Sequence, residues 1–460
     1  MRRAGETRVV WRRALLGALA LPFSLGRRRG AAHGGRAVRA PAEPPSNGTD
    51  ANQVPPTPWE RGRLARPVRA ASDRETARCR PRILLIRPDH LGDLLLTTPA
   101  LALLREALPA ARLEALIGPW AVPALAGRTE LDHVETCAFP GFTREPAGSP
   151  LAPYWRLAVE ARRLRRARYD AALVLRADHW WGAALAAYAG IPLRLGYGVA
   201  ESRGFLTHAL PPDLTQHSVD ENWRLVAALV RLLGRPLPRE RPGPVVAVPL
   251  PAGELTAAQW LGARGVPARA RLVAIHPGTG AAVKLWPSAR WSAVGDALAR
   301  RLEARVVVTG SAAERALVAA VVGGMAEPAV DAAGALDWEG LGGLFARSAL
   351  VLGVDSGPLH LAAALGVTTV HVFGPTAPAR FGPRGRGAHR VVRVPLPCSP
   401  CGNLIAPPCG ARAEPACLQA VASAAVVEAA LAAVDAAGEW PVGAGLAVEA
   451  GTAGVGRRRA

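Results

Sequence analysis

Three loops of the sequence carry residues that could bind an anion or move a proton. The first loop, Arg87-Pro88-Asp89-His90-Leu91-Gly92-Asp93, lies between a short apolar run and a helix-like one. A glycine just before a helix lets another backbone approach closely, and the free amide groups there attract anions. Asp93 therefore has two interpretations, a reactive carboxylate or an acid that only favours the start of the helix. No G-x-G-x-x-G fingerprint follows an expected strand, which argues against binding of NAD(P).

The second loop, His276 to Pro287, contains the only lysine of the chain, Lys284. Small residues precede this lysine, among them Gly278, Thr279 and Gly280. The loop is not a Walker A motif, because Lys284 follows no glycine and precedes no Ser or Thr. A loop of small residues can still wrap phosphate oxygens while one ammonium offsets their charge. All other basic residues are arginine, so a single retained lysine favours a phosphate site over an exposed turn.

The third loop is Val354-Asp355-Ser356-Gly357-Pro358-Leu359-His360, which follows another apolar run. Ser356 and Gly357 stand where the cap and free amides of a helix would bind a second phosphate, with Asp355 at the end of the strand. A further loop, Phe373-Gly374-Pro375-Thr376, ends the next strand. Several such loops at strand ends favour a phosphate-bearing ligand in a cleft.

Four cysteines fall within 20 residues near the end of the chain, at Cys398, Cys401, Cys409 and Cys417. The C-x2-C pair is a good half-site for Zn or Fe, although the later spacings differ from those of common zinc modules. Reduced free thiols or disulfides are the alternatives. The sequence therefore predicts a structural metal at this cluster as one of three outcomes.

The elements expected to position these loops alternate between apolar runs and amphipathic segments, which is typical of parallel α/β sheets. Helical segments lie between the runs, such as Leu94–Leu108, Trp291–Leu302, Leu341–Ser348 and Leu361–Leu365. The first set of expected strands is Ile83–Ile86, Leu113–Ile117, Asp170–Leu175 and Leu193–Tyr197, and the second is Leu272–His276, Arg305–Thr309, Leu350–Gly353 and Thr369–Phe373. We expect two facing Rossmann-like domains, with ligands outside the carboxyl ends of the strands.

The expected organisation has four parts. Residues 1–80 lack a sustained period and are predicted to be a disordered basic extension, with an export signal as the alternative. Residues 81–250 and 251–440 are predicted to be the two domains, joined by the proline-rich segment Pro236–Pro251. Residues 441–460 are predicted to be a flexible tail.

Composition excludes several classes of protein. Half of the 460 residues are hydrophobic and 6 are cysteines, which argues against a wholly disordered chain and against a disulfide scaffold. No apolar run reaches the ~20 residues of a membrane-spanning helix, so we expect the bulk of the chain to be soluble. The net charge of +20 lies mostly in the tails, which hold few aromatic residues, so we expect no nucleic acid partner.

In their order, the three loops resemble the ADP-heptose:lipopolysaccharide heptosyltransferase family. The resemblance rests on Arg82–Leu101, His276–Pro287 and Asp355–His360, and runs from about Pro81 to about Ala437. It implies a GT-B fold whose first domain binds an acceptor and whose second binds a nucleotide sugar. It also implies an inverting transfer, without a metal or other cofactor, of a heptose or related sugar from ADP-heptose to a lipopolysaccharide core sugar or similar glycan, in the cytoplasm and in peripheral contact with the inner membrane.

The resemblance also implies roles for residues. Asp93 would be the general base beside the acceptor, near His90 and Gly92, and Lys284 would neutralise the diphosphate as ADP leaves. The donor and phosphate site would comprise Gly278, Thr279, Gly280, Glu314, Asp355, Ser356, Gly357 and His360. Cysteine clusters occur in relatives that glycosylate proteins and bind iron, so a protein acceptor is one alternative. A non-catalytic nucleotide-binding protein of the same fold is the other.

Overall fold

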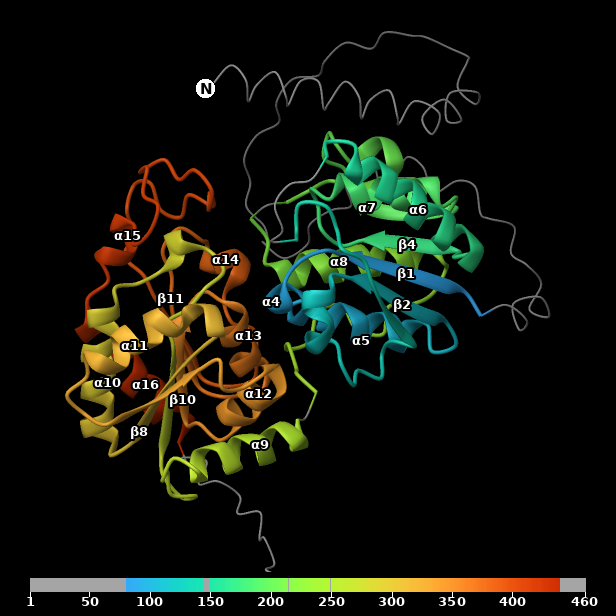
Figure 1. Cartoon of the computed structure of the whole chain (residues 1–460). Coiled ribbons are helices and arrows are strands. Elements are labelled where there is room, and N and C mark those ends of the chain that lie inside the picture. The colour runs from blue at the N-terminus through green and yellow to red at the C-terminus, as the bar shows by residue number, and fades with distance from the viewer. Residues whose placement is uncertain (1–79, 144–148, 214, 249, 439–460) are drawn as a thin grey trace, which may run out of the picture.

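Two parallel sheets organise the chain, as Figure 1 shows. The computed structural model describes residues 80–143, 149–213, 215–248 and 250–438. The expectations of a disordered extension before residue 80 and of a flexible tail after residue 440 lie outside the described residues. Of the helices that the structure describes, none is long and apolar enough to cross a membrane.

The first sheet is six-stranded and entirely parallel, in the order β3-β2-β1-β4-β5-β6. Its strands are β1 (Arg82–Arg87), β2 (Arg112–Ile117), β3 (His133–Thr136), β4 (Ala171–Val174), β5 (Leu193–Tyr197) and β6 (His208–Leu210). Its helices are α4 (Leu91–Leu95), α5 (Thr98–Ala107), α6 (Ala152–Ala167), α7 (Trp180–Tyr188) and α8 (Ser218–Leu232). Alternate residues of β1 point to opposite faces, so Ile83 and Leu85 pack with α5 and α8, while Leu84 and Ile86 pack with α6 and α7.

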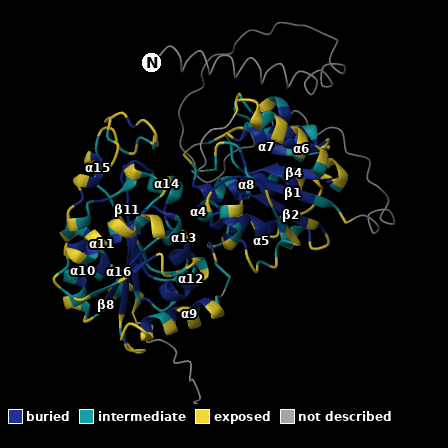
Figure 2. Cartoon of the chain, viewed as in Figure 1, coloured by how far each residue is buried: buried dark blue, intermediate teal, exposed yellow. Residues whose placement is uncertain are grey.

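The second sheet is also six-stranded and parallel, in the order β12-β11-β10-β7-β8-β9. Its strands are β7 (Leu272–His276), β8 (Arg305–Gly310), β9 (Ala329–Ala333), β10 (Leu350–Val354), β11 (Thr369–Val372) and β12 (His389–Val392). Its helices are α9 (Pro251–Gly262), α10 (Ser288–Leu302), α11 (Arg315–Gly323), α12 (Trp338–Ala346), α13 (Gly357–Ala364), α14 (Pro378–Phe381), α15 (Ala416–Gln419) and α16 (Ser423–Ala437). Helices α10, α11 and α16 pack on one face, and α9, α12 and α13 cover the other. Figure 2 shows both sheets as buried interiors with exposed residues on the outer helices.

Both sheets have the strand order of a Rossmann fold. The order reverses between β1 and β4 in the first sheet and between β7 and β10 in the second. At such a switch point the loops on either side diverge, which leaves a crevice outside the carboxyl ends of the strands. The predicted pair of Rossmann-like α/β domains is confirmed, and the three loops singled out in the sequence follow β1, β7 and β10.

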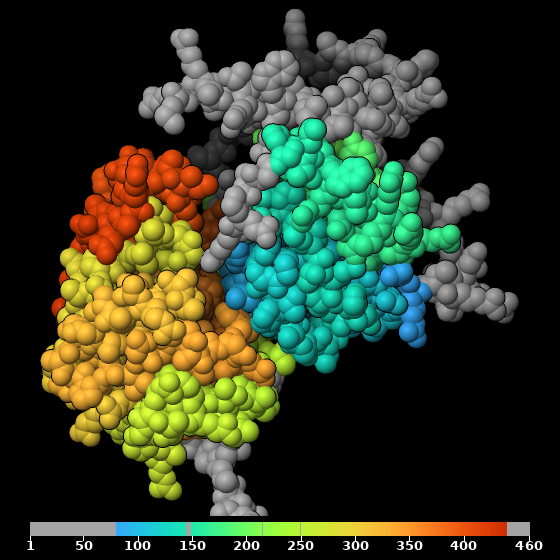
Figure 3. Space-filling model, in the orientation of Figure 1, coloured from blue at the N-terminus to red at the C-terminus, as the bar shows by residue number. Residues whose placement is uncertain are grey.

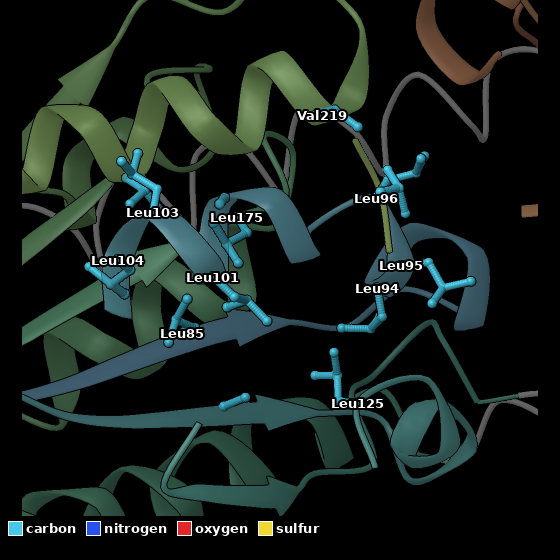
Figure 4. Close-up of a cluster of buried hydrophobic side chains, with 14 of the residues drawn as sticks. Leu85, Leu94, Leu95, Leu96, Leu101, Leu103, Leu104, Leu125, Leu175 and Val219 are labelled. Atoms are coloured by element: carbon cyan, nitrogen blue, oxygen red, sulfur yellow. The ribbon is translucent and has the colours of Figure 1, made fainter. Parts of the chain in front are cut away.

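The start of the first helical region differs from its prediction. Instead of one helix over Leu94–Leu108, the chain forms α4 and then α5, with a break at Thr97. Pro99 lies in the first turn of α5, where its missing N–H costs no hydrogen bond. At the break, the Thr97 hydroxyl donates a hydrogen bond to the carbonyl oxygen of Asp93 at 2.9 Å. Leu94 and Leu95 anchor α4 in the apolar cluster of Figure 4, so this short helix holds Asp93 in place at the sheet edge.

The expected strands are present, and four others were not anticipated. These are β3, β6, β9 and β12, which form the outer strands of the two sheets. These strands have three to five residues, several of which are exposed. Their sequences are therefore not the apolar runs by which the other strands were predicted. The segment predicted as a linker packs closely: Val245 donates its N–H to Arg384 O at 2.9 Å and Ala247 to Ala364 O at 3.0 Å.

Candidate functional site

The loops after β1 and β10 bring the two halves into contact. A Cβ atom placed on Gly92 would lie 3.0 Å from Gly357 Cα and 2.9 Å from Cδ2 of His360. Glycine at both positions lets the first turns of α4 and α13 approach, as the sequence predicts for Gly92. Figure 3 shows the halves as distinct lobes, and Gly92 and Gly357 join them at the carboxyl edges of their sheets.

Lys284 spans the switch point of the second sheet. It ends a short 3-10 helix, Ala282–Lys284, in the loop after β7. Its Nζ donates to the main-chain oxygen of Asp355 at 2.7 Å and lies 3.2 Å from Asp355 Oδ2. The Thr279 hydroxyl approaches the same main-chain oxygen at 3.5 Å. The loops after β7 and β10 thus converge on one point, as expected if both contact one ligand.

Asp355 is a buried carboxylate held in its charged form. Burial opposes this charge, but Lys284 and His360 keep the pKa of Asp355 well below its usual range. His360 Nε2 lies 3.7 Å from Asp355 Oδ1. The neighbouring Ser356 precedes the first turn of α13, and its buried hydroxyl has no hydrogen-bond partner among the described residues. An unpartnered hydroxyl beside the amides of a helix start fits an anionic ligand such as a phosphate.

Gly278 and Glu314 lie side by side at the ends of β7 and β8. A Cβ atom on Gly278 would overlap the carboxylate of Glu314, so any other residue there would displace that carboxylate. The Glu314 Oε2 accepts hydrogen bonds from the N–H and the hydroxyl of Ser311, each at 2.8 Å, which fixes the carboxylate beside the loop. Gly280 is exposed at the tip of the same loop. The structure thus gathers the residues of the predicted donor side around one switch point.

Asp93 lies in the first turn of α4, on the other side of the contact between the halves. Arg87 Nη2 is 3.8 Å from Asp93 Oδ1, whereas Arg87 Nε pairs with Asp89 at 2.7 Å. Burial, followed by repulsion from Asp89, raises the pKa of Asp93 above its usual value. A helix start alone would lower this pKa, so it does not set the direction of the shift. A helix of five residues has a weak dipole, and burial together with the charge of Asp89 outweighs it.

The rest of this charge network was missed in the sequence. Asp89 is buried and also pairs with Arg176, which lies in the loop after β4. His179 follows in that loop and is buried among Phe139, Phe142 and Trp181. In the described part of the chain, neither of its ring nitrogens has a hydrogen-bond partner. Burial lowers the pKa of His179 to about 4. Their position in the sequence could have indicated them, because they follow β4, which flanks the switch point of the first sheet.

His90 lies beside this network. It is exposed, and its ring centroid is 5.8 Å from that of Trp120. The Trp120 indole donates to the main-chain oxygen of Asp89 at 3.0 Å, which fixes the loop that carries His90.

Polar contacts between α8 and the α14 region also join the halves. His217 Nε2 donates to Gly382 O at 2.9 Å, while its Nδ1 accepts from the N–H of Val219 at 3.1 Å. Arg380 pairs with Glu221 at 3.1 Å. These contacts hold the two switch points opposite each other.

The four clustered cysteines do not assemble into the predicted ligand set. Among the described residues, no group of three or more His, Cys, Asp or Glu side chains could hold a metal ion. Cys398 and Cys409 are exposed, whereas Cys417 is buried at α15, where burial raises the pKa of its thiol. All four are free thiols. A metal here stays a hypothesis, tested by elemental analysis of the purified chain.

The geometry suits transfer of a group that leaves as a phosphate. One side offers an ammonium, helix amides and a free hydroxyl for an anion, and the other offers a carboxylate of raised pKa that can take up a proton. The sequence profile of glycosyltransferase family 9 (heptosyltransferase) matches residues 157–404.

Similar proteins are found by sequence and by structure. Lipopolysaccharide heptosyltransferase 1 of Pseudomonas aeruginosa is 28% identical over 326 residues, which cover 70% of this chain and 86% of that protein. Lipopolysaccharide heptosyltransferase 3 of Escherichia coli is 29% identical over 295 residues, covering 62% and 81%.

Two solved structures share the fold. A family 9 glycosyltransferase from Veillonella parvula superposes with a TM-score of 0.65 at 21% identity, covering 77% of this chain and 98% of that one. The E. coli ADP-heptose lipopolysaccharide heptosyltransferase II superposes with a TM-score of 0.60 at 20% identity, covering 77% of this chain and 99% of that one. This likeness shows the two-domain GT-B fold. With the profile covering more than half of its length, the chain belongs to glycosyltransferase family 9, the heptosyltransferase family.

Proposed function

We propose that this glycosyltransferase moves a heptose from ADP-heptose to a sugar of a lipopolysaccharide core, with inversion at the anomeric carbon. The observation that carries the proposal is the convergence of Lys284, Thr279 and the start of α13 on one point, directly opposite Asp93. The names of the similar proteins support the sugar and the acceptor. We also propose that residues 81–250 bind the acceptor and residues 251–440 bind the donor, with the chain acting in the cytoplasm.

In the proposed reaction, Asp93 is the general base. Its carboxylate takes the proton of the acceptor hydroxyl while the hydroxyl oxygen bonds to the anomeric carbon of the heptose. The bond between that carbon and the diphosphate oxygen breaks at the same time, so ADP leaves from the opposite face. A raised pKa makes the ionised Asp93 carboxylate a better proton acceptor than that of an ordinary aspartate.

Lys284 neutralises the negative charge that develops on ADP as it leaves. Its ammonium is held by Asp355 and is therefore in position before a diphosphate binds. The amides of α13 and the Ser356 hydroxyl supply further donors, and Glu314 is placed to accept from the ribose. Fixed donors aimed at a leaving phosphate stabilise the transition state without a metal ion.

A panel of nucleotide sugars tests the donor. ADP-heptose should raise the melting temperature more than ADP-glucose, and a UDP-sugar should have no effect, since a ligand at 100 times its dissociation constant adds about 2.7 kcal/mol. Incubation with ADP-heptose and a lipopolysaccharide truncated before its heptoses should give a product one heptose heavier. Its anomeric configuration, read by NMR, should be opposite to that of the donor. Retention of configuration would exclude the direct displacement proposed here.

A further inference from the structure

Helix α6 carries an apolar stripe that nothing in the described chain covers. Leu151, Trp155 and Val159 follow one another at intervals of four residues and are 73%, 71% and 46% exposed. A second stripe on the same helix, Leu157, Ala161 and Leu164, is buried against the first sheet. Because that second stripe already anchors α6, the exposed one is not needed for folding.

The exposed stripe is bordered by positive charge. The C-terminal half of α6 continues it with Arg162, Arg165 and Arg166, all exposed, and Arg156 is exposed beside Trp155. The only acid in the helix, Glu160, is paired with Arg163 at 2.7 Å. A helix face that combines Trp and Leu with arginine fits an anionic lipid surface, into which the apolar side chains insert while the guanidinium groups meet phosphates.

The position of the stripe relates it to the catalytic edge. Helix α6 leads into β4, so its C-terminus lies at the start of that strand and its N-terminus lies near the carboxyl edge. Trp181, in the first turn of α7, donates to Pro153 O at 2.9 Å, which ties this end of α6 to the helix that follows the Arg176 loop. Figures 1 and 2 show α6 beside α7 with exposed residues on its outer side. A membrane against the stripe would lie next to the loops of the first sheet.

A second copy of the chain fits this surface less well. A stable interface between proteins buries about 800 Å² on each side, which is much more than three side chains supply. A two-fold interface centred on the stripe would also bring its arginines close to those of the partner.

We propose that Leu151, Trp155 and Val159, with the arginines of α6, dock the chain onto an anionic lipid bilayer. Docking in this orientation holds the first sheet's loops at the lipid surface, where an acceptor with a lipid anchor would be presented. The presentation of a lipid-anchored acceptor rests on the proposed function, but the docking itself does not.

The test measures binding of the full chain to vesicles in the absence of sugar substrates. Vesicles of phosphatidylglycerol and phosphatidylcholine should sediment the wild-type chain, whereas phosphatidylcholine alone should bind it much more weakly. The variant Leu151→Ser/Trp155→Ser/Val159→Ser should bind about tenfold or more weakly, since it removes the apolar side chains that insert into the bilayer. Leu255→Ser is the matched control, because Leu255 is 46% exposed on α9 in the other half and should bind like wild type. Equal melting temperatures would show that the variants are folded.

The salt dependence of vesicle binding distinguishes binding through the stripe from binding through the other basic parts of the chain. In about 1 M salt the Debye length falls to about 3 Å, so residual binding reports apolar insertion. The triple variant should lose this residual binding, and Arg162→Gln/Arg166→Gln should weaken binding only at low salt. A triple variant that binds vesicles as well as wild type would overturn the proposal and assign the attraction to other basic segments. So would a wild-type dimer that the triple variant dissociates. A chain that binds vesicles but transfers no heptose would refute only the proposed function.

Discussion

Lys284 and Asp355 connect the two strands that flank the switch point of the second sheet. The Lys284 ammonium lies 2.7 Å from the main-chain oxygen and 3.2 Å from the carboxylate of Asp355, although the two residues are 71 positions apart. This contact fixes a flexible side chain before any ligand binds. A preorganised ammonium costs less reorganisation during the reaction than one recruited from solvent.

Replacement of Lys284 should slow transfer strongly. We expect Lys284→Ala to reduce kcat about 10²- to 10³-fold, the usual effect of removing one strong electrostatic stabiliser. Steady-state kinetics with ADP-heptose would measure this. Lys284→Arg should restore only part of the rate, because the planar guanidinium cannot take the place of a compact ammonium against Asp355. Wild-type turnover in Lys284→Arg would mean that charge alone matters.

Replacement of Asp93 should separate activity from stability. Asp93→Asn keeps the size of the side chain but cannot take up the acceptor proton, so kcat should fall about 10²-fold or more. The affinity for ADP, measured by calorimetry, should be nearly unchanged because Asp93 lies on the acceptor side. Loss of ADP binding would instead place Asp93 in the donor site.

The same variant has an expected effect on folding. A carboxyl group whose pKa is raised in the folded state stabilises the fold below its unfolded pKa of about 4, and that contribution is lost as the pH rises through the folded value. At neutral pH Asp93 therefore makes the chain less stable than it is in acid. Asp93→Asn should raise the melting temperature at pH 7, and the difference should vanish near pH 3. In the wild type, kcat/KM should fall on acidification with a midpoint above pH 4.

Much of the fold could be predicted because parallel strands buried on both faces are apolar runs. Ile83–Ile86 and Leu272–Ile275 are of this kind, and the loops after them carry the small residues that mark a phosphate site. The resemblance to heptosyltransferases rested on the same loops, so the family followed from residues that the structure places at the two switch points. The outer strands were not predicted, because strands such as His133–Thr136 and His389–Val392 carry polar residues on a partly exposed edge.

The charge network beside Asp93 could not be predicted, since it depends on distance in space. Arg176 is 87 residues from Asp89, and only the pairing of β1 with β4 brings them together. The pKa of Asp93 is raised because burial, with repulsion from Asp89 added to it, outweighs the effect of the helix start. The cysteine spacing was a weaker guide, as a local pattern does not determine whether four thiols converge.

Gly92 should be intolerant of any side chain. In Gly92→Ala the new methyl group would stand 3.0 Å from Gly357 Cα, so the halves must separate slightly at the site. Displacement of the reacting groups by about 1 Å costs about 10²-fold in rate, so even a smaller shift should lower kcat about tenfold. Gly262→Ala, on α9, is the matched control because, among the described residues, nothing beyond its chain neighbours and the backbone of its own helix lies within 4 Å of its Cβ position. Equal rates in the two variants would show that the contact between α4 and α13 does not control the reaction.

Acid should loosen the contact between the halves through His217. Burial, the largest cause, lowers the pKa of this histidine to about 4, and the neutral ring accepts from Val219 N–H and donates to Gly382 O. A histidine with a lowered pKa stabilises the fold above its unfolded value of about 6.5, and this contribution is lost as the pH falls toward 4, by up to about 1.4 kcal/mol per pH unit.

His217→Gln should retain both hydrogen bonds without titrating. Urea unfolding of wild type and variant at pH values from about 7.5 down to about 4, a range that spans the ordinary histidine pKa of about 6.5, should show a smaller loss of stability in the variant. Other buried histidines titrate in both proteins, so the difference between the two curves isolates His217. His133→Gln, on the exposed outer strand, should leave the wild-type curve unchanged. Parallel curves for His217→Gln and wild type would show that protonation of His217 does not open this contact.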